Sequence, residues 1–305
     1  MKRKRFLYQI ISLIILSLLG TACGGGGSDS PQNQSAQQNG SPLAYEWLMD
    51  PDSTGPLVAA HRGAHKDAPE NSLAAIRAAS LLGADFVEVD VRHTLDGVLV
   101  LMHDSNASRT TGLDAEINTL TYAQVQQLTL LNSDSSDPET TQVPTLNEAL
   151  TLASEVSVML YVDIRTDRDD LVVAAIQAGD YYKVALLRDS LDHVIKMYEQ
   201  DSSLLLMPPA GNIDDLNAAV AAVPGLKIVE YSDEAPNAEF CAAAREAGVK
   251  VQQDVFVRGD ILAVLTGSYS GWASFIEAGV WLLQTDEPEM LVPAVLEYRE
   301  TGVFP

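Results

Sequence analysis

Eight short apolar runs recur between residues 57 and 285, and segments with helical spacing of apolar residues separate most of them. We interpret these runs as strands at residues 57–60, 84–91, 157–165, 184–188, 204–207, 228–231, 250–256 and 281–285. A further run, 98–102, extends the second strand unit, and the polar segment 111–143 follows it. This succession indicates an α/β fold, although periodicity alone allows both a barrel and a doubly wound sheet.

Polar side chains stand on or directly after the first strands. The run 57–60 leads into His61 and Arg62, and the run 98–102 leads into His103. On the second strand, side chains alternate between the two faces, so Glu88 and Asp90 lie on one face and valines on the other. Because the carboxyl ends of parallel strands meet at one edge, we expect two histidines and two carboxylates to lie close together.

A third carboxylate, Asp163, is expected on the same inner face from the strand 157–165. Burying Glu88, Asp90 and Asp163 without a cation would cost several kcal/mol each. Three carboxylates suit one divalent cation of the hard class, Mg²⁺ or Ca²⁺. The alternative is a salt-bridge network in which Arg92 or Arg165 neutralises the three acids.

Five motifs follow one another within about forty-five residues and resemble the pattern of the glycerophosphodiester phosphodiesterase family. They are HRG at 61–63, PEN at 69–71, E-x-D at 88–90, T-x-DG at 94–97 and HD at 103–104. The resemblance extends over roughly residues 57–298. Together with the strand pattern, it predicts a (β/α)8 TIM barrel with an excursion after the second strand unit. It implies hydrolysis of glycerophosphodiesters to sn-glycerol 3-phosphate and an alcohol.

The resemblance also implies roles for individual residues. His61 and His103 correspond to the general acid and base, and imidazole suits both tasks near neutral pH. Arg62 and Arg165 are expected to bind the substrate phosphate, Arg62 as the phosphate clamp and Arg165 at a position where the family usually carries a lysine. Glu70 is expected to support a histidine or the metal, unless it is an ordinary acidic residue in the first turn of a helix. We interpret the remaining histidines as background, namely His65, His93 and His193.

Three positions depart from the family pattern or allow a second interpretation. Asp163 stands where the family usually has glutamate and is one methylene shorter. On the seventh strand, residues 251–254 are Val, Gln, Gln and Asp instead of including an aromatic residue, which indicates a different headgroup preference or an extra ligand from Asp254. Asp286 matches a terminal motif of the family, but it precedes Pro288, and we predict that it caps a helix.

The amino-terminal segment resembles the signal of a bacterial lipoprotein. Four basic residues at 2–5 precede an apolar stretch at 6–19, and small residues precede Cys23. We predict a signal peptide at 1–23, a lipidated Cys23, a flexible tether at 24–41 and a catalytic domain at 42–305. A chance cysteine in an ordinary signal peptide is the alternative. The expected location is the cell envelope, with the chain anchored to a membrane by lipid alone.

The net charge of the chain limits the classes of molecule that it can bind. The chain has 19 basic and 42 acidic residues, and removing the four basic residues of the signal leaves 15 − 42 = −27. Such a domain is unsuited to nucleic acids or to anionic membranes. We expect a small phosphodiester as substrate, held by local positive charge, and no protein partner is implied.

Two other functions remain open on the sequence. A phosphodiesterase of similar layout could act on intact phospholipids, in the manner of sphingomyelinase D or phosphatidylinositol phospholipase C. Alternatively, the chain could bind phosphodiesters without catalysis, although the presence of both His61 and His103 argues against this.

Overall fold

The computed structural model describes residues 42–133 and 136–305. The predicted signal peptide at 1–23, the lipidation site Cys23 and the tether at 24–41 lie outside the described residues. Within the described part of the chain, no helix has both the length and the apolar character needed to cross a membrane.

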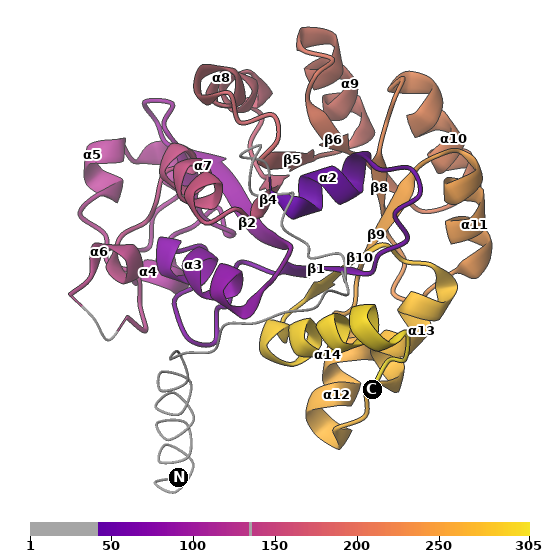
Figure 1. Ribbon diagram of the computed structural model, residues 1–305. Helices are drawn as coiled ribbons and strands as arrows, with labels where there is room; N and C mark the ends of the chain where they lie inside the picture. Colours follow the sequence, from indigo (N-terminus) through magenta and orange to yellow (C-terminus); the bar gives the residue numbers. More distant parts are fainter. Residues whose placement is uncertain (1–41, 134–135) are drawn as a thin grey trace, which may run out of the picture. The chain divides into compact units, whose positions relative to one another are not determined.

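The strands form a parallel ring (Figure 1). Its members are β1 (Leu57–Ala60), β2 (Phe86–His93), β4 (Met159–Ile164), β5 (Ala185–Arg188), β6 (Leu205–Met207), β7 (Pro209–Ala210), β8 (Ile228–Tyr231), β9 (Lys250–Asp254) and β10 (Leu282–Thr285). The first strand pairs with both β2 and β10. Only Pro208 separates β6, which pairs with β5, from β7, which pairs with β8, so a split strand closes the ring. The predicted TIM barrel is confirmed.

A helix follows each strand unit and packs on the outside of the barrel. These helices are α3 (Leu73–Leu82), α7 (Leu146–Glu155), α8 (Asp169–Gly179), α9 (Leu191–Gln200), α10 (Ile213–Ala222), α11 (Ala238–Glu246), α13 (Ser270–Ala278) and α14 (Pro288–Thr301). Polar side chains begin several of them: Ser72 accepts a hydrogen bond from the amide of Ala75, and Thr145 forms a capping box with Glu148. Each such cap stabilises its helix by about 1 kcal/mol.

The predicted alternation of faces on β2 is also confirmed. Val87, Val89 and Val91 belong to the apolar layer between strands and helices, whereas Phe86 belongs to the cluster inside the barrel. Glu88 and Asp90 share the inner face with Phe86 because side chains alternate along a strand.

A short helix that the sequence analysis did not predict, α2 (Leu43–Met49), covers the amino-terminal end of the barrel. Figure 1 shows it lying across the middle of the ring of strands. Its buried residues Ala44 and Leu48 pack in the same cluster as Leu57, Ile228 and Trp281. Burying a leucine of this kind stabilises a fold by about 2 kcal/mol. Helix α2 therefore closes the amino-terminal end of the barrel with apolar contacts.

The predicted excursion follows β2. It contains β3 (Leu99–Leu101), which pairs antiparallel with β2, and the short helices α4 (Ser108–Thr111), η2 (Ile117–Thr119), α5 (Tyr122–Val125) and α6 (Pro138–Thr141). A small apolar cluster that includes Val100 and Met102 holds this segment together. A second irregular segment, η3 (Phe256–Asp260) and α12 (Ile261–Thr266), lies between β9 and α13. Both segments bring side chains to the carboxyl ends of the strands.

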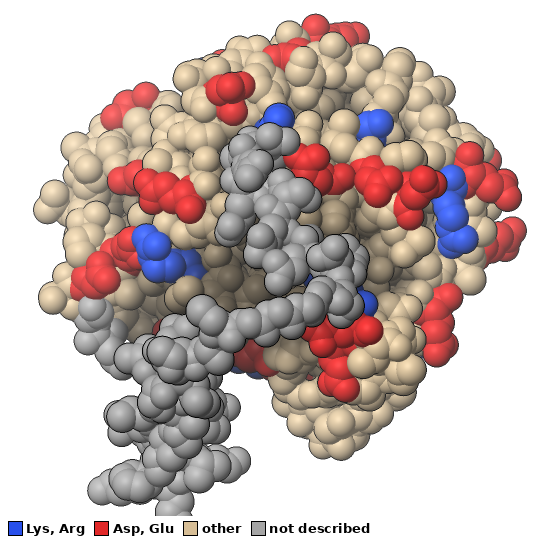
Figure 2. All heavy atoms as spheres, in the orientation of Figure 1, with Lys and Arg blue, Asp and Glu red and all other residues tan. Residues whose placement is uncertain are grey.

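Acidic side chains dominate the charged surface. Figure 2 shows Asp and Glu spread over one face of the molecule, with few Lys and Arg among them, in keeping with 42 acidic and 19 basic residues in the chain. Positive charge is therefore found in individual ion pairs, several of which lie in the site described next.

Candidate active site

Three carboxylates converge inside the barrel near the carboxyl ends of the strands. Glu88 and Asp90 come from β2, and Asp163 comes from β4; the three residues are 2%, 0% and 8% exposed. Each offers an oxygen atom that lies within 4.8 Å of an oxygen of the other two. Burial, together with the charges of Asp90 and Asp163, raises the pKa of Glu88 well above its usual value. The cluster therefore requires positive charge close by.

Part of that charge comes from arginines. Arg165 donates from Nε to Oδ1 of Asp90 at 2.5 Å, and its Nη2 lies 2.7 Å from Oδ2 of Asp163. Arg188, at the end of β5, reaches Oδ1 of Asp163 at 3.2 Å. The predicted role for Arg92 in neutralising the acids is wrong, because its guanidinium donates to the backbone oxygens of His103 and Arg165.

The three carboxylates also fit the predicted divalent cation. Their donor set consists of buried oxygens only, and such a set suits a hard cation. Burial and the neighbouring acids raise the pKa of Glu88 in spite of the arginines, and a bound cation would reduce the cost of keeping the three carboxylates charged. An arginine network and a cation site are therefore compatible in this structure.

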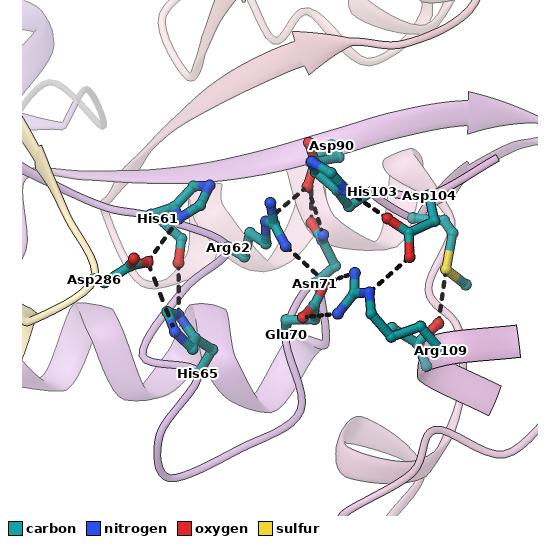
Figure 3. Close-up of polar contacts among 12 residues, drawn as sticks. His61, Arg62, His65, Glu70, Asn71, Asp90, His103, Asp104, Arg109 and Asp286 are labelled. Atoms are coloured by element: carbon teal, nitrogen blue, oxygen red, sulfur yellow. Dashed lines mark hydrogen bonds and ion pairs between the residues drawn. The ribbon is translucent and has the colours of Figure 1, made fainter. Parts of the chain in front are cut away.

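His61 faces the carboxylate cluster and is fixed from its other side. Its Nδ1 lies 2.7 Å from Oδ1 of Asp286 (Figure 3). Its Nε2 lies 3.9 Å from Oε2 of Glu88. Phe256 packs against the imidazole with 4.7 Å between ring centroids. Because the carboxylate accepts a hydrogen bond from Nδ1–H, the lone pair of neutral His61 is on Nε2, toward the cluster.

The prediction that Asp286 caps a helix is wrong. Helix α14 begins after Glu287, and no side chain caps it. Asp286 instead binds His61, and its backbone amide donates to Oδ2 of Asp260 at 2.7 Å. Burial tends to raise the pKa of Asp286, but the hydrogen bond and the charge of His61 lower it below its usual value. The family motif at this position was the signal that should have been preferred.

His103 is fixed in the same way as His61. Its Nδ1 lies 2.7 Å from Oδ1 of Asp104, whose Oδ2 accepts a hydrogen bond from Nε of Arg109 at 2.6 Å. That bond from Arg109 holds the pKa of Asp104 at about 2, so the carboxylate is charged at neutral pH. Two imidazoles, each with Nδ1 bound to an aspartate, thus present Nε2 as the atom available for proton transfer.

Arg62 sits in a sharp turn at the end of β1. Its φ of 55° is in the left-handed region, and Gly63 follows with φ 82°. A Cβ on Gly63 would lie 2.7 Å from backbone and side-chain carbons of Ala75, so only glycine fits against α3. The amide of Arg62 donates to Oε2 of Glu88 at 2.8 Å. The buried Nε of Arg62 makes no hydrogen bond among the described residues, but it lies at ion-pair distance, 3.5 Å, from Oδ2 of Asp90. A donor for an anionic ligand therefore remains at the cluster.

Glu70 binds two arginines directly and is linked to His103 only through Arg109 and Asp104. It accepts two hydrogen bonds from Arg109, at 2.6 and 2.7 Å, and one from Nη1 of Arg62 at 3.1 Å (Figure 3). It also precedes the helix cap Ser72, so it does not belong to the first turn of α3. Next to it, Asn71 donates to Oδ2 of Asp90 at 2.8 Å and accepts from the Asp90 amide at 3.0 Å. The PEN motif therefore positions Arg62 and Asp90.

The wall of the site at β8 and β9 is acidic. A pocket of about 190 Å³ is lined by residues that include Glu230, Tyr231, Asp254 and Phe256. Glu230 pairs with Nε of Arg188 at 2.5 Å. Burial and the charge of Glu230 raise the pKa of Asp254 to about 7. Asp254 was expected from the sequence, whereas Arg188 and Glu230 were not, because they become neighbours of the site only through the fold.

A model of the glycerophosphoryl diester phosphodiesterase family matches residues 61–259. Glycerophosphodiester phosphodiesterase 1 of Mus musculus is 41% identical over 115 residues, which are 36% of this chain and 34% of the relative. Glycerophosphodiester phosphodiesterase of Caldanaerobacter subterraneus subsp. tengcongensis is 34% identical over 110 residues, 36% of this chain and 45% of the relative. The matched segments thus span between a third and a half of these relatives.

Solved structures share the fold. A glycerophosphoryl diester phosphodiesterase from Parabacteroides distasonis superposes with a TM-score of 0.68 at 19% identity, covering 84% of this chain and 91% of that one. A phosphodiesterase from Oleispira antarctica, solved in complex with the product sn-glycerol-3-phosphate, gives a TM-score of 0.64 at 21% identity, covering 83% and 99%. These similarities support the barrel assignment.

Proposed function

Because the chain belongs to the glycerophosphoryl diester phosphodiesterase family, we propose that it hydrolyses glycerophosphodiesters to sn-glycerol 3-phosphate and an alcohol. The observation that carries the proposal is the pair His61 and His103. Each has Nδ1 within 2.7 Å of an aspartate oxygen, and each is delivered to the barrel end that holds the carboxylate cluster. This arrangement suits proton transfer at two oxygens of one phosphodiester.

In the proposed Michaelis complex, the phosphate lies between the carboxylate cluster and Arg62. Glu88, Asp90 and Asp163 would hold Mg²⁺ or Ca²⁺, which, when bound, would withdraw charge from a phosphate oxygen. Arg62 Nε lies 3.5 Å from Oδ2 of Asp90 without a hydrogen bond, and the guanidinium can donate to a second phosphate oxygen. Arg165 stays with Asp90 and Asp163, and it adds positive charge to the same region.

Proton transfer is assigned to the two imidazoles. One takes the proton of the attacking hydroxyl at Nε2. If that hydroxyl is water, sn-glycerol 3-phosphate forms directly; if it is the glycerol hydroxyl next to the phosphate, a cyclic phosphate forms first and water then opens it to sn-glycerol 3-phosphate. The other gives a proton to the departing alkoxide as its bond to phosphorus breaks, so no free alkoxide forms. Asp286 and Asp104 hold the two rings through Nδ1 and stabilise each imidazole when it carries a second proton.

The test is release of sn-glycerol 3-phosphate from glycerophosphocholine, glycerophosphoethanolamine and glycerophosphoglycerol, with Mg²⁺, with Ca²⁺ and with EDTA. We expect metal-dependent release that falls at least about 10²-fold in His61→Ala and in His103→Ala. His93→Ala is the control, because this histidine bonds Thr166 outside the cluster. Absence of release from all three compounds, or turnover only with intact phospholipid vesicles, would overturn the proposal.

We also propose that the chain is a lipoprotein of the cell envelope, anchored through Cys23. The support is the order of basic, apolar and small residues before that cysteine. The full chain should sediment with membranes after expression, and Cys23→Ser should release it in soluble form. Equal membrane association of both forms would contradict the lipid anchor.

A further inference from the structure

A second group of metal-ligating side chains lies outside the site described above. Asp169 is the first residue of α8, Asp189 directly follows β5, and His193 is in the first turn of α9. Figure 1 shows α8 and α9 as neighbours on the outside of the barrel. Each of the three residues offers a ligand atom within 4.8 Å of the others. The fold thus joins residues from two consecutive strand and helix units.

The separations between these atoms match those around a metal ion. Nδ1 of His193 lies 3.1 Å from Oδ2 of Asp189 and 3.4 Å from Oδ1 of Asp169. Ligands about 2.1 Å from a metal are about 3.0 Å apart in octahedral and about 3.4 Å apart in tetrahedral coordination. An ion could therefore enter with little movement of the side chains.

The group also has an unsatisfied acceptor. The side chain of Asp169 is 9% exposed, and its buried Oδ1 accepts no hydrogen bond from any described residue. Oδ1 of Asp189 accepts from the amide of Ser190 at 2.6 Å, which turns its Oδ2 toward His193. A buried carboxylate oxygen without a hydrogen bond is unfavourable, and it is aimed at the point where the other two ligands meet.

We propose that Asp169, Asp189 and His193 bind a divalent transition-metal ion, such as Zn²⁺ or Mn²⁺. One imidazole and two carboxylates favour this class over Mg²⁺ and Ca²⁺, which take oxygen ligands. Three protein ligands leave positions for water. This ion is distinct from the one proposed at Glu88, Asp90 and Asp163, and it does not depend on the catalytic activity of the chain.

Such an ion would restrain the two segments of the chain that carry its ligands. The segment after β4 carries Arg165, and β5 ends in Arg188, and both guanidinium groups contact Asp163. An ion held by Asp169 and Asp189 would tie these two segments together. It would fix the arginines that surround the carboxylate cluster without touching the substrate.

The test is isothermal titration of the purified, metal-depleted chain with Zn²⁺, in the presence of Mg²⁺ in excess. We expect one equivalent of Zn²⁺ to bind, and Asp169→Asn and His193→Gln each to weaken that binding by more than about 100-fold. Asp192→Asn, an exposed acid on the same helix, is the matched control and should bind like the parent chain.

Glu88→Gln distinguishes the two proposed metal sites. It changes the carboxylate cluster, so the variant should still bind one equivalent of Zn²⁺ at Asp169, Asp189 and His193. Circular dichroism identifies any variant that fails to fold. Any of three results would overturn the proposal. The parent chain binds no Zn²⁺, the folded variants Asp169→Asn and His193→Gln bind Zn²⁺ as the parent does, or Glu88→Gln loses the binding. Because binding is measured directly, a chain without phosphodiesterase activity would still give a decisive result.

Discussion

Replacing Asp286 by asparagine should slow turnover without unfolding the barrel. The carboxylate holds Nδ1 of His61 at 2.7 Å, and asparagine keeps its size but lacks the charge. Asparagine can also present its amide nitrogen to Nδ1, which would reverse the tautomer and place the proton on Nε2. The variant therefore tests whether the orientation and protonation of His61 limit the reaction.

The expected decrease in kcat follows from the hydrogen bond between Asp286 and His61. A hydrogen bond to a charged group contributes about 1.5–3 kcal/mol. Because the side chain of Asp286 is 41% exposed, solvent weakens its charge, and we take the lower part of this range, about 1.5–2 kcal/mol. At about 1.4 kcal/mol per decade, kcat should fall about 10- to 30-fold. KM should change little, because the proposed role is to position His61 and not to bind substrate.

The assay is steady-state release of sn-glycerol 3-phosphate at saturating metal. Asp214→Asn, which removes an exposed carboxylate in the first turn of α10, serves as the charge control. A value of kcat within a factor of two of the parent, with the thermal midpoint unchanged, would refute the reasoning. A rise in KM at constant kcat would show that Asp286 acts on substrate binding instead.

Three further outcomes are expected. The pKa of Asp254 is about 7 in the folded chain and about 3.9 in the unfolded chain. The metal-free folded state therefore binds more protons than the unfolded state between about pH 4 and pH 7, and its stability falls as the pH rises through this range. Asp254→Asn should consequently raise the melting temperature at about pH 8 but not at about pH 4. Gly63→Ala should destabilise by about 2–4 kcal/mol more than Gly225→Ala in urea unfolding, because both have positive φ but only Gly63 meets Ala75. Glu70→Gln should raise KM about 10-fold in the phosphodiesterase assay, since it loosens Arg62; an unchanged KM would contradict this role.

Local patterns were sufficient for the strands and for the faces of β2. Alternation of side chains depends only on the backbone of one strand, so Glu88 and Asp90 could be placed inside before any contact was known. The resemblance of the five motifs to the family pattern, together with the strand pattern, then implied the barrel. The helix α2 was missed because it is short, and its stabilising contacts are with strands far along the chain.

The side-chain partners in the site could not be predicted in the same way. Asp286 meets His61 because β10 pairs with β1, which no local pattern specifies. Glu70 meets Arg109 across the excursion, and Arg188 meets Glu230 across the barrel mouth. Each pair is set by ring closure or by loop packing, and these follow from the summed contacts of the whole barrel.

The pairing of the first and last strands also determines when, during synthesis, the contact between His61 and Asp286 can form. His61 and Asp286 are 225 positions apart, and a polypeptide emerges with its amino end first. Until Asp286 has emerged, β1 lacks β10 beside it and His61 lacks the carboxylate on Nδ1. After Asp163 has emerged, a nascent chain therefore carries both histidines and all three clustered acids, but His61 lacks its carboxylate partner until Asp286 follows.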